Sequence, residues 1–575
     1  MTVPNLGQYA LFVVFVIACV KPVGLYLVRV FNRDKTPLDP VLLPIERLFY
    51  RAAGIDPQSE MNWKEYAFAF AIFGVFGTVL LSALLLFQRS LPWFDPGHQS
   101  TPMTFDLALN TAISFATTTT WQAYGGETTM SYFSQMVGLA AQNFMAGAAG
   151  LAVGIAFIRG LAREKTMGLG NFWVDLTRAM LWVLLPLSVA GGVFLIWQGV
   201  PMNFNPYTNA TTLEGAAQVI AQGPVAALES IKNLGTNGGG FLNVNGAHPY
   251  ENPTALTNVV EMLMIVVLPA SLIYTFGHTV GRTRQGWMFL GVMTFLFAAG
   301  LSLATWAEQS GNPRITALGV GTQASDLQAG GNMEGKDVRF EIQGSVLAAV
   351  ATSNGATGSY NSMHDSYTPL GGMVPLVNML LGEVVYGGLG TGLYSMVMIV
   401  LVSVFIGGLM VGRTPTFLGK QVRQQETKLV AFYMILGTAV VLVLTSIAIA
   451  TAWGRAGLAV NTGAHGFTEI LFAYSSSFAN NGQSFAGLNA NSVFYNLTTA
   501  VAMLAGRFGS AALALALAGS FVVQPRKPDT AGSLETDTPT FAIFVTATVI
   551  ILVGLSYLPA LALGPIIEHL MMAVP

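Results

Sequence analysis

Ten long apolar stretches constrain what this chain can fold into more than any other feature. Each runs for roughly 20 residues or more, the length that a helix needs to cross ~30 Å of hydrocarbon. They begin near positions 8, 65, 131, 179, 255, 286, 372, 429, 491 and 540. Only 9% of the residues are charged, against about 25% in a typical soluble domain. The sequence therefore predicts an all-α integral membrane protein with ten transmembrane helices.

Positive charge divides the connections between these stretches into two sets. Most of the 26 Lys and Arg lie in or beside the shorter connections, at 31–64, 159–178, 281–285, 413–428 and 524–539. Few lie in the longer connections, at 89–130, 199–254, 308–370 and 454–490. The positive-inside rule then places both termini outside. The net charge of −2 gives no basic excess that would suit nucleic acid, so lipids are the expected surroundings.

Each long outside connection contains a semi-apolar stretch that is too short to span the membrane, which predicts a re-entrant helix. Each stretch leads into a small polar cluster: Thr120-Trp121-Gln122, Thr236-Asn237-Gly238, Ser353-Asn354-Gly355 and Asn480-Asn481-Gly482. This recurrence predicts four pseudo-symmetric helix–pore-loop–helix repeats around one axis, flanked by one extra helix at each end. The expected units are 1–62, the repeats 63–165, 166–283, 284–425 and 426–525, and the last helix in 526–575.

The four clusters predict a filter for a monovalent cation. One such cluster alone is typical of an ordinary turn, but four copies at the same place in each repeat favour a shared function. Irregular backbone at membrane depth is tolerated where protein buries it or where it lines water, and its carbonyl oxygens replace the hydration shell of a dehydrated ion. The clusters lack the carboxylates that calcium and magnesium sites recruit, which favours potassium.

The first cluster differs from the others in its side chains. Gln122 is aligned with Gly238, Gly355 and Gly482, so one quadrant of the predicted ring offers an amide. That amide either tunes selectivity or turns away from the pore and holds the loop by hydrogen bonds. We expect Trp121 to pack behind the filter.

Two further features are candidates for a barrier beneath the filter. Arg507 lies in the middle of a span and must either pair or face water. Near the inner end of the filter it would repel cations; the alternative is a structural pair with a carboxylate or with helix carbonyls. The segment Tyr386–Gly392 interrupts an apolar run too long for one crossing, so we expect a broken helix there. Its glycines Gly387, Gly388, Gly390 and Gly392 serve either a gate or close helix packing.

The remaining polar residues carry weaker signals. Glu127, Glu251, Glu383 and Glu469 are expected on or near the outside, where they either concentrate cations or are simply solvated. The six histidines, His465 among them, show no metal-ligand spacing. No nucleophile–base pair or phosphate-binding loop is apparent. We therefore expect a chain that is not an enzyme by itself and that binds no cofactor, with potassium as its substrate.

Several longer motifs resemble those of a known family, the potassium-binding A subunits (KdpA) of the bacterial Kdp potassium-transporting ATPases. The resemblance covers nearly the whole chain. It rests on TTTTWQAYGGETT around Thr120, Ile231–Asn243, His248–Asn258, Met363–Pro375, Gly412–Lys420 and Gly506–Gly509. By motif position, Gln122, Gly238, Gly355 and Gly482 carry over as filter residues, and Arg507 as the charge below the filter. The third loop, Gly355–Met363, is a few residues longer than the family pattern.

The resemblance implies a channel-like subunit of a complex in the bacterial inner membrane. Such a subunit captures external potassium and delivers it to a P-type ATPase subunit (KdpB-like), which hydrolyses ATP. A single-span periplasmic subunit (KdpC-like) and a small membrane subunit (KdpF-like) are the other implied partners. From the repeats alone, a self-sufficient potassium channel or symporter of the same four-repeat superfamily is the alternative.

Overall fold

The computed structural model describes residues 3–325, 328–410, 412, 414–528 and 534–572. Position 413, within the motif Gly412–Lys420, and positions 529–533 of the last short connection lie outside the described residues. Ten helical segments in the described part are long and apolar enough to cross a membrane. The predicted all-α membrane fold with ten spans is confirmed. The spans are Gly7–Asn32, Trp63–Leu86, Ser134–Ala162, Phe172–Trp197, Ala255–Thr279, Thr283–Ala317, Thr391–Met410, Gln424–Ala450, Val493–Val522 and Pro539–Met572.

Several spans are built from more than one helical element. The continuous ones are α1 (Val3–Asn32), α3 (Trp63–Leu86), α10 (Ala255–Thr279), α11 (Thr283–Gln309), α15 (Thr391–Met410) and α16 (Gln424–Ala450). The composite ones are η2 (Ser134–Ala140) with α6 (Ala141–Ala162), α7 (Phe172–Arg178) with η3 (Ala179–Leu184) and α8 (Leu185–Trp197), α19 (Val493–Leu504) with η6 (Ala505–Gly509) and α20 (Ser510–Val522), and α21 (Pro539–Leu561) with η7 (Ala562–Ile566) and α22 (Ile567–Met572).

Polar caps fix where several spans begin. The Asn62 side chain accepts hydrogen bonds from the backbone of Lys64 and Glu65, while Glu65 accepts one from the Asn62 backbone. Thr254 and Thr257 form the same reciprocal arrangement at the start of α10. Such capping boxes satisfy the first amides of a helix, which otherwise have no partner.

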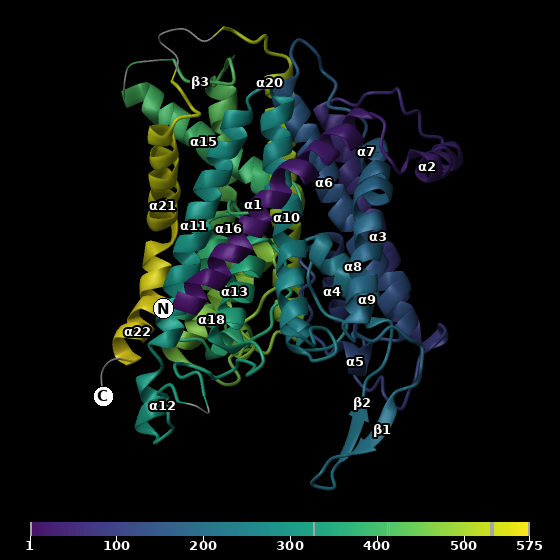
Figure 1. Ribbon diagram of the computed structural model, residues 1–575, viewed down its shortest axis with the longest axis vertical. Helices are drawn as coiled ribbons and strands as arrows, with labels where there is room; N and C mark the ends of the chain where they lie inside the picture. The colour runs from purple at the N-terminus through teal and green to yellow at the C-terminus, as the bar shows by residue number, and fades with distance from the viewer. Residues whose placement is uncertain (1–2, 326–327, 411, 413, 529–533, 573–575) are drawn as a thin grey trace.

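Four shorter helices lie between the spans: α4 (Phe105–Ala116), α9 (Val225–Leu234), α13 (Glu341–Asn354) and α18 (Gly463–Phe478). Figure 1 shows all four in the lower half of the molecule. We call these four the pore helices. Each packs on a helix of the preceding repeat, and the first packs on a helix of the fourth repeat: α4 on α19, α9 on α6, α13 on α10, and α18 on α14 (Pro369–Leu380). These pore helices therefore surround one axis, as predicted from the four polar clusters.

The long apolar run that contains Tyr386–Gly392 is broken, as predicted, but its first half is a separate short helix. Helix α14 ends at Leu380, and the seventh span, α15, begins at Thr391 and not near position 372, so residues 381–390 connect the two helices as non-helical backbone. Gly390 adopts a φ of 92° and packs on α6, where a Cβ would clash with the Gly150 carbonyl oxygen. The break thus lies against the centre of the bundle.

The remaining elements lie at the two ends of the bundle (Figure 1). The strands β1 (Thr208–Thr211) and β2 (Ala217–Ile220) form an antiparallel hairpin at the lower end, and β3 (Thr416–Phe417) pairs with β4 (Lys420–Gln421) at the upper end. Helix α2 (Asp39–Ala53) also lies at the upper end. The short helices are η1 (Gln88–Ser90), α5 (Gly126–Thr129), η4 (Asn245–Ala247), α12 (Pro313–Ala317), η5 (His364–Ser366) and α17 (Ala452–Arg455).

The two flanking helices pack on different spans of the bundle. Helix α1 lies against α10, and α21 lies against α11 and α15. Helix α6 is central: 83% of its span is buried, and it contacts α10, α15 and α20. The two ends of the described chain, where α1 begins and α22 ends, both lie in the lower half of Figure 1, with the pore helices.

Candidate ion-binding site

The four pore helices end in the same backbone geometry. In each, the second residue after the helix is left-handed: Thr118 (φ 64°), Thr236 (50°), Ala356 (50°) and Asn480 (53°). In three of them the next amide bonds back to the third-last helical carbonyl, at 3.0 Å for Asn237 to Lys232, 3.0 Å for Thr357 to Thr352 and 2.9 Å for Asn481 to Ser476. This is a Schellman ending, which turns the chain sharply out of the helix. In the first loop Thr120, one residue later, makes the corresponding 3.0 Å bond to Ser114.

The four loops that follow these turns form a closed ring; we name the pore loops 1 to 4 as residues 117–122, 235–240, 355–360 and 479–484. Loop 1 meets loop 2 where the Thr120 hydroxyl donates to the Asn237 carbonyl at 2.5 Å. Loop 2 meets loop 3 at Gly238, where a Cβ would clash with the Gly358 backbone. Loop 3 meets loop 4 where a Cβ on Gly358 would lie 2.9 Å from the Asn481 carbonyl oxygen.

Loop 4 closes the ring onto loop 1. The Asn480 amide donates to the Thr119 hydroxyl at 3.0 Å, and a Cβ on Gly482 would clash with the Thr119 carbonyl oxygen. Gly238 and Gly482 have φ values of 86° and 89°, a region that favours glycine, so backbone geometry and close approach both require it there. The ring thus brings carbonyl-bearing backbone from all four repeats together.

The shared left-handed turn corrects the predicted register of two clusters. Ser353 and Asn354 lie in the last turn of α13 and Gly355 is its C-cap, so in loop 3 the residue equivalent to Gly238 is Gly358. In loop 1 it is Thr120, with a φ of 51°, not Gln122. In loops 2 and 4 the predicted clusters do occupy equivalent positions after the left-handed turn. These clusters are Thr236-Asn237-Gly238 and Asn480-Asn481-Gly482. The sequence comparison sets Gln122 and Gly355 against Gly238 and Gly482, whereas the backbone turns of loops 1 and 3 place Thr120 and Gly358 there.

The Gln122 side chain joins loop 1 to loop 2 by hydrogen bonds. Its amide nitrogen donates to the Gly240 carbonyl at 3.0 Å, and its amide oxygen accepts from the Gly240 nitrogen at 2.8 Å. The same nitrogen contacts the Tyr124 hydroxyl at 3.0 Å. Of the two interpretations of Gln122, these contacts favour the one in which it braces the loops. Trp121 is buried in an apolar cluster, in agreement with the predicted packing role.

Cavities lie on both sides of the ring. On the side away from Arg507, which we call the outer side, a cavity of about 840 Å³ is lined by residues of loops 1, 3 and 4, including Gln122, Tyr360 and Ser484, and by Asn243 beyond loop 2. On the side of Arg507, which we call the inner side, a space of about 10 Å³ is lined by all four left-handed residues, Thr118, Thr236, Ala356 and Asn480. That volume is close to the space of a single water molecule.

The inner space is bounded by the candidate barrier residues. Gly388, Leu389, Glu383 and Arg507 line it together with the pore loops. The broken span is tied directly to loop 2, because the Leu389 amide donates to the Thr236 hydroxyl at 3.0 Å. Arg507 is buried in η6 and donates to the Ala146 carbonyl at 2.9 Å. The sequence-predicted Arg507 and glycine-rich segment therefore meet directly beneath the ring.

The four glutamates do not form an open external ring of carboxylates. Glu251, Glu383 and Glu469 are buried, and Glu383 lies on the inner side of the loops. Glu127 is half-buried and accepts the Asn243 amide at 2.8 Å. The alternative of a simply solvated carboxylate is wrong for Glu251, Glu383 and Glu469, because sequence position alone does not reveal burial, and it stays a prediction for Glu127.

A buried ion-pair cluster supports loop 2, and sequence reasoning missed it. Lys232 in α9 contacts Glu229 at 2.7 Å and Glu251 at 3.7 Å, and all three side chains are buried. Glu251 also accepts the Leu242 amide at 2.9 Å. The spacing of Glu229 and Lys232 is a helical i,i+3 pair, but Glu251 comes from beyond the loop and only the fold brings it near. The cluster ties the pore helix to the backbone that leaves loop 2.

Comparison with known proteins agrees with this architecture. The family described as KdpA, Potassium-transporting ATPase A subunit, matches residues 10–570. The chain belongs to the KdpA family. A relative from Methylobacterium nodulans, named potassium-transporting ATPase potassium-binding subunit, is 50% identical over 99% of this chain and 98% of its own length. Relatives with the same name from Sorangium cellulosum (50% identical, 100% of both chains) and Rhodopseudomonas palustris (48%, 100% of this chain and 99% of the relative) are similar to this KdpA-family chain.

A solved structure shares the fold. The crystal structure of the potassium transporter TrkH from Vibrio parahaemolyticus aligns with a TM-score of 0.51, covering 89% of this chain and 98% of that one. Its sequence is 14% identical, so the match supports the architecture only.

Proposed function

We propose that the pore loops bind a potassium ion from outside and that this KdpA-family chain passes it to a separate P-type ATPase subunit, which hydrolyses ATP. The observation that carries the proposal is the closed ring of four loops. Each loop leaves its pore helix through the same left-handed turn, and the four turn residues line one small space above Arg507. Carbonyl oxygens gathered in this way can replace the hydration shell of a weakly hydrated cation.

The electrostatics of the ring favour a monovalent cation. The C-terminal end of each pore helix carries partial negative charge and leads directly into a loop. Two residues of each loop form the ring, and none of them bears a carboxylate. They are Thr119 and Thr120, Asn237 and Gly238, Thr357 and Gly358, and Asn481 and Gly482. Calcium and magnesium sites usually recruit carboxylates, so the donor set suits potassium better.

Arg507 and the broken span form the proposed barrier to straight flow. A guanidinium stays charged, so a cation leaving the ring along its axis meets a positive group. Gly387 and Gly392 pack on each other, and Gly388 approaches Ala356, so the segment fits closely under the loops. The expected result is an ion held at the ring until it leaves by another route.

The names of the relatives support a complex with an ATPase. On this basis we propose a KdpB-like catalytic subunit, a KdpC-like single-span periplasmic subunit and a KdpF-like small membrane subunit as partners, in the bacterial inner membrane. Both termini would lie outside, because two basic connections, one with Lys420 in β4 and one with Arg526 after α20, are at the end of the bundle opposite the pore loops. The chain itself would supply no catalytic group.

The test is ATP hydrolysis by the purified complex at increasing potassium. We expect hydrolysis to depend on potassium in the complex that contains this chain, and this dependence to shift to higher potassium in Gly238→Asp. Gly291→Ala, where no atom lies within 4 Å of the added Cβ, serves as the matched control. A self-sufficient channel or symporter would instead conduct potassium without a partner and without any ATP hydrolysis that responds to potassium.

A further inference from the structure

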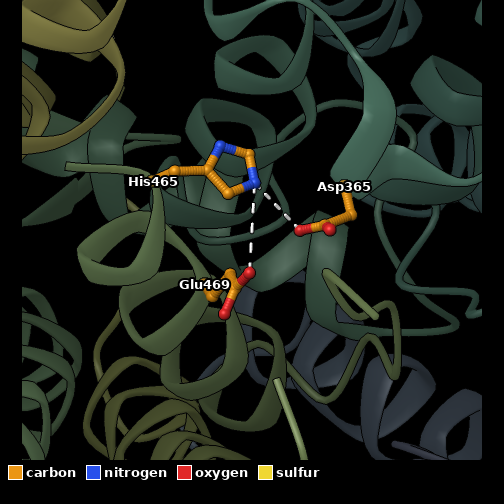
Figure 2. A group of neighbouring side chains, drawn as sticks. All are labelled: Asp365, His465 and Glu469. Carbon is orange, nitrogen blue, oxygen red and sulfur yellow. Dashed lines mark hydrogen bonds and ion pairs between the residues drawn. The ribbon is translucent and has the colours of Figure 1, made fainter. Parts of the chain in front are cut away.

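A histidine between two carboxylates lies on the outer side of the molecule, apart from the pore loops. In Figure 2 the His465 ring points one nitrogen toward both Asp365 and Glu469. His465 Nε2 lies 3.0 Å from Asp365 Oδ1 and 4.0 Å from Glu469 Oε1. His465 and Glu469 are one turn apart on α18, and Asp365 comes from η5, just after loop 3. The three donor atoms all lie within 4.8 Å of one another.

The cluster has an outer shell that fixes the ring. Glu568 Oε1 of α22 lies 2.7 Å from His465 Nδ1, so that a proton on Nδ1 is donated to this carboxylate and Nε2 faces the two other carboxylates. The Asn461 amide reaches Glu469 at 2.7 Å and Asp365 at 3.4 Å, so both carboxylates are held on the same side of the ring. A carboxylate on the far nitrogen of a histidine is the usual outer partner of a metal-binding imidazole.

Glu469 contributes a fully buried carboxylate to the cluster. Its Oε1 faces His465, whereas its Oε2 points away from the ring in Figure 2. A buried carboxylate is costly unless hydrogen bonds, a proton or a cation satisfy it. Ions can reach the cluster from outside, because Asp365, His465 and Glu568 line a cavity of about 720 Å³.

We propose that His465, Asp365 and Glu469 bind a divalent transition-metal ion on the outer face of the protein. The donor set of one imidazole nitrogen and two carboxylate oxygens is one that Zn²⁺ takes, at roughly 2.0–2.2 Å from each ligand. Calcium and magnesium prefer oxygen ligands alone, and imidazole in the set therefore disfavours them. The three donor atoms lie within 4.8 Å of one another, and binding of an ion would draw them closer together.

Both ring nitrogens of His465 lie within hydrogen-bond distance of a carboxylate, Nε2 at 3.0 Å from Asp365 Oδ1 and Nδ1 at 2.7 Å from Glu568 Oε1. When an ion binds Nε2, a proton held there leaves to solvent and the ion takes its place between Asp365 and Glu469. The bound ion would join the N-terminal end of the fourth pore helix to the segment that follows loop 3.

The test uses the full chain, purified with the subunits that accompany it, stripped with a chelator and titrated with ZnCl₂ at constant potassium. We expect one site that is lost in His465→Ala and Asp365→Asn and weakened by ~10–100-fold in Glu568→Gln, as for other outer-shell carboxylates. His98→Ala is the control, since His98 contacts a single carboxylate, Asp95, at 2.7 Å on the same face. Excess CaCl₂ should not displace the ion. Equal binding in wild type and His465→Ala, or equal displacement by calcium, would overturn the proposal.

A second measurement does not depend on the folding of any variant. Crystals of the wild-type protein soaked in Zn²⁺ should give an anomalous peak at the zinc edge at ~2.0–2.2 Å from His465 Nε2. No peak there at saturating zinc contradicts the proposal. Because the cluster is separate from the pore loops, potassium-dependent hydrolysis is measured independently, and a failure of one proposal leaves the other intact.

Discussion

Gly238 of loop 2 packs directly on the backbone of Gly358 in loop 3, so that a Cβ on Gly238 would clash with the Gly358 amide nitrogen. This contact is one of the four that close the ring of pore loops. It also identifies Gly358 as the loop 3 counterpart of Gly238. Neighbouring loops approach so closely that the ring has no room for larger residues at these positions.

The contact predicts a strong effect of substitution at Gly358. Gly358→Ala places a Cβ 2.9 Å from the Asn481 carbonyl oxygen and forces loops 3 and 4 apart. Overpacking of this kind costs ~1–3 kcal/mol, which corresponds to a rise of about tenfold or more in the potassium concentration for half-maximal hydrolysis. Ser353→Ala, in the last turn of α13, is the matched control and should change that concentration far less. A larger effect of Ser353→Ala than of Gly358→Ala would contradict the assignment of Gly358 as the loop 3 counterpart of Gly238.

Gln122 should matter through the backbone it holds. Gln122→Glu keeps the size of the side chain but replaces its donor to the Gly240 carbonyl by an acceptor. A partly buried hydrogen bond of this kind contributes ~1 kcal/mol, so we expect weaker discrimination of potassium from sodium. Competition of the two ions in a hydrolysis assay measures this. If selectivity were unchanged and only the maximal rate fell, Gln122 would not act through the ring.

Arg507 should prevent flow that bypasses the pump. Arg507→Gln removes the charge beneath the ring and retains a donor for the Ala146 carbonyl. We expect rubidium uptake into proteoliposomes without ATP, or a lower ratio of ions moved to ATP hydrolysed. Arg507→Lys keeps the charge and should leak less. Tight coupling in Arg507→Gln would remove this residue from the mechanism.

Lys420 should stabilise the end of the bundle opposite the pore loops. Its buried ammonium donates to the carbonyls of Gly160 at 3.2 Å and Phe521 at 2.9 Å, and to that of Arg163. These carbonyls end α6 and α20, and hydrogen bonds from a charged donor contribute ~1.5–3 kcal/mol. Lys420→Met should therefore lower the melting temperature of the purified protein by several degrees. Lys527→Met, at an exposed position, is the control and should not.

Sequence periodicity was sufficient for the spans but not for the ring. The ten apolar runs and the break near Gly387 follow from hydropathy, because lipid requires long apolar helices. The predicted alignment of loops 1 and 3 with the other two was wrong because glycine normally marks a left-handed helix end. Here Thr118, Thr236 and Ala356 occupy that position. Likewise, Asp365 and Glu568 lie about a hundred residues from His465 in opposite directions, so no spacing rule finds their cluster. Both misses concern contacts that only the closed fold creates.

We propose that the ring of pore loops binds the transported ion. Anomalous diffraction from crystals soaked in Rb⁺, a heavier substitute for potassium, shows directly where the ion binds. We expect a peak on the axis of the ring, within reach of the backbone carbonyls of Thr119, Asn237, Thr357 and Asn481, and a weaker peak in Gly238→Asp. A saturated wild-type crystal with Rb⁺ bound elsewhere in the chain and none at the ring would contradict it.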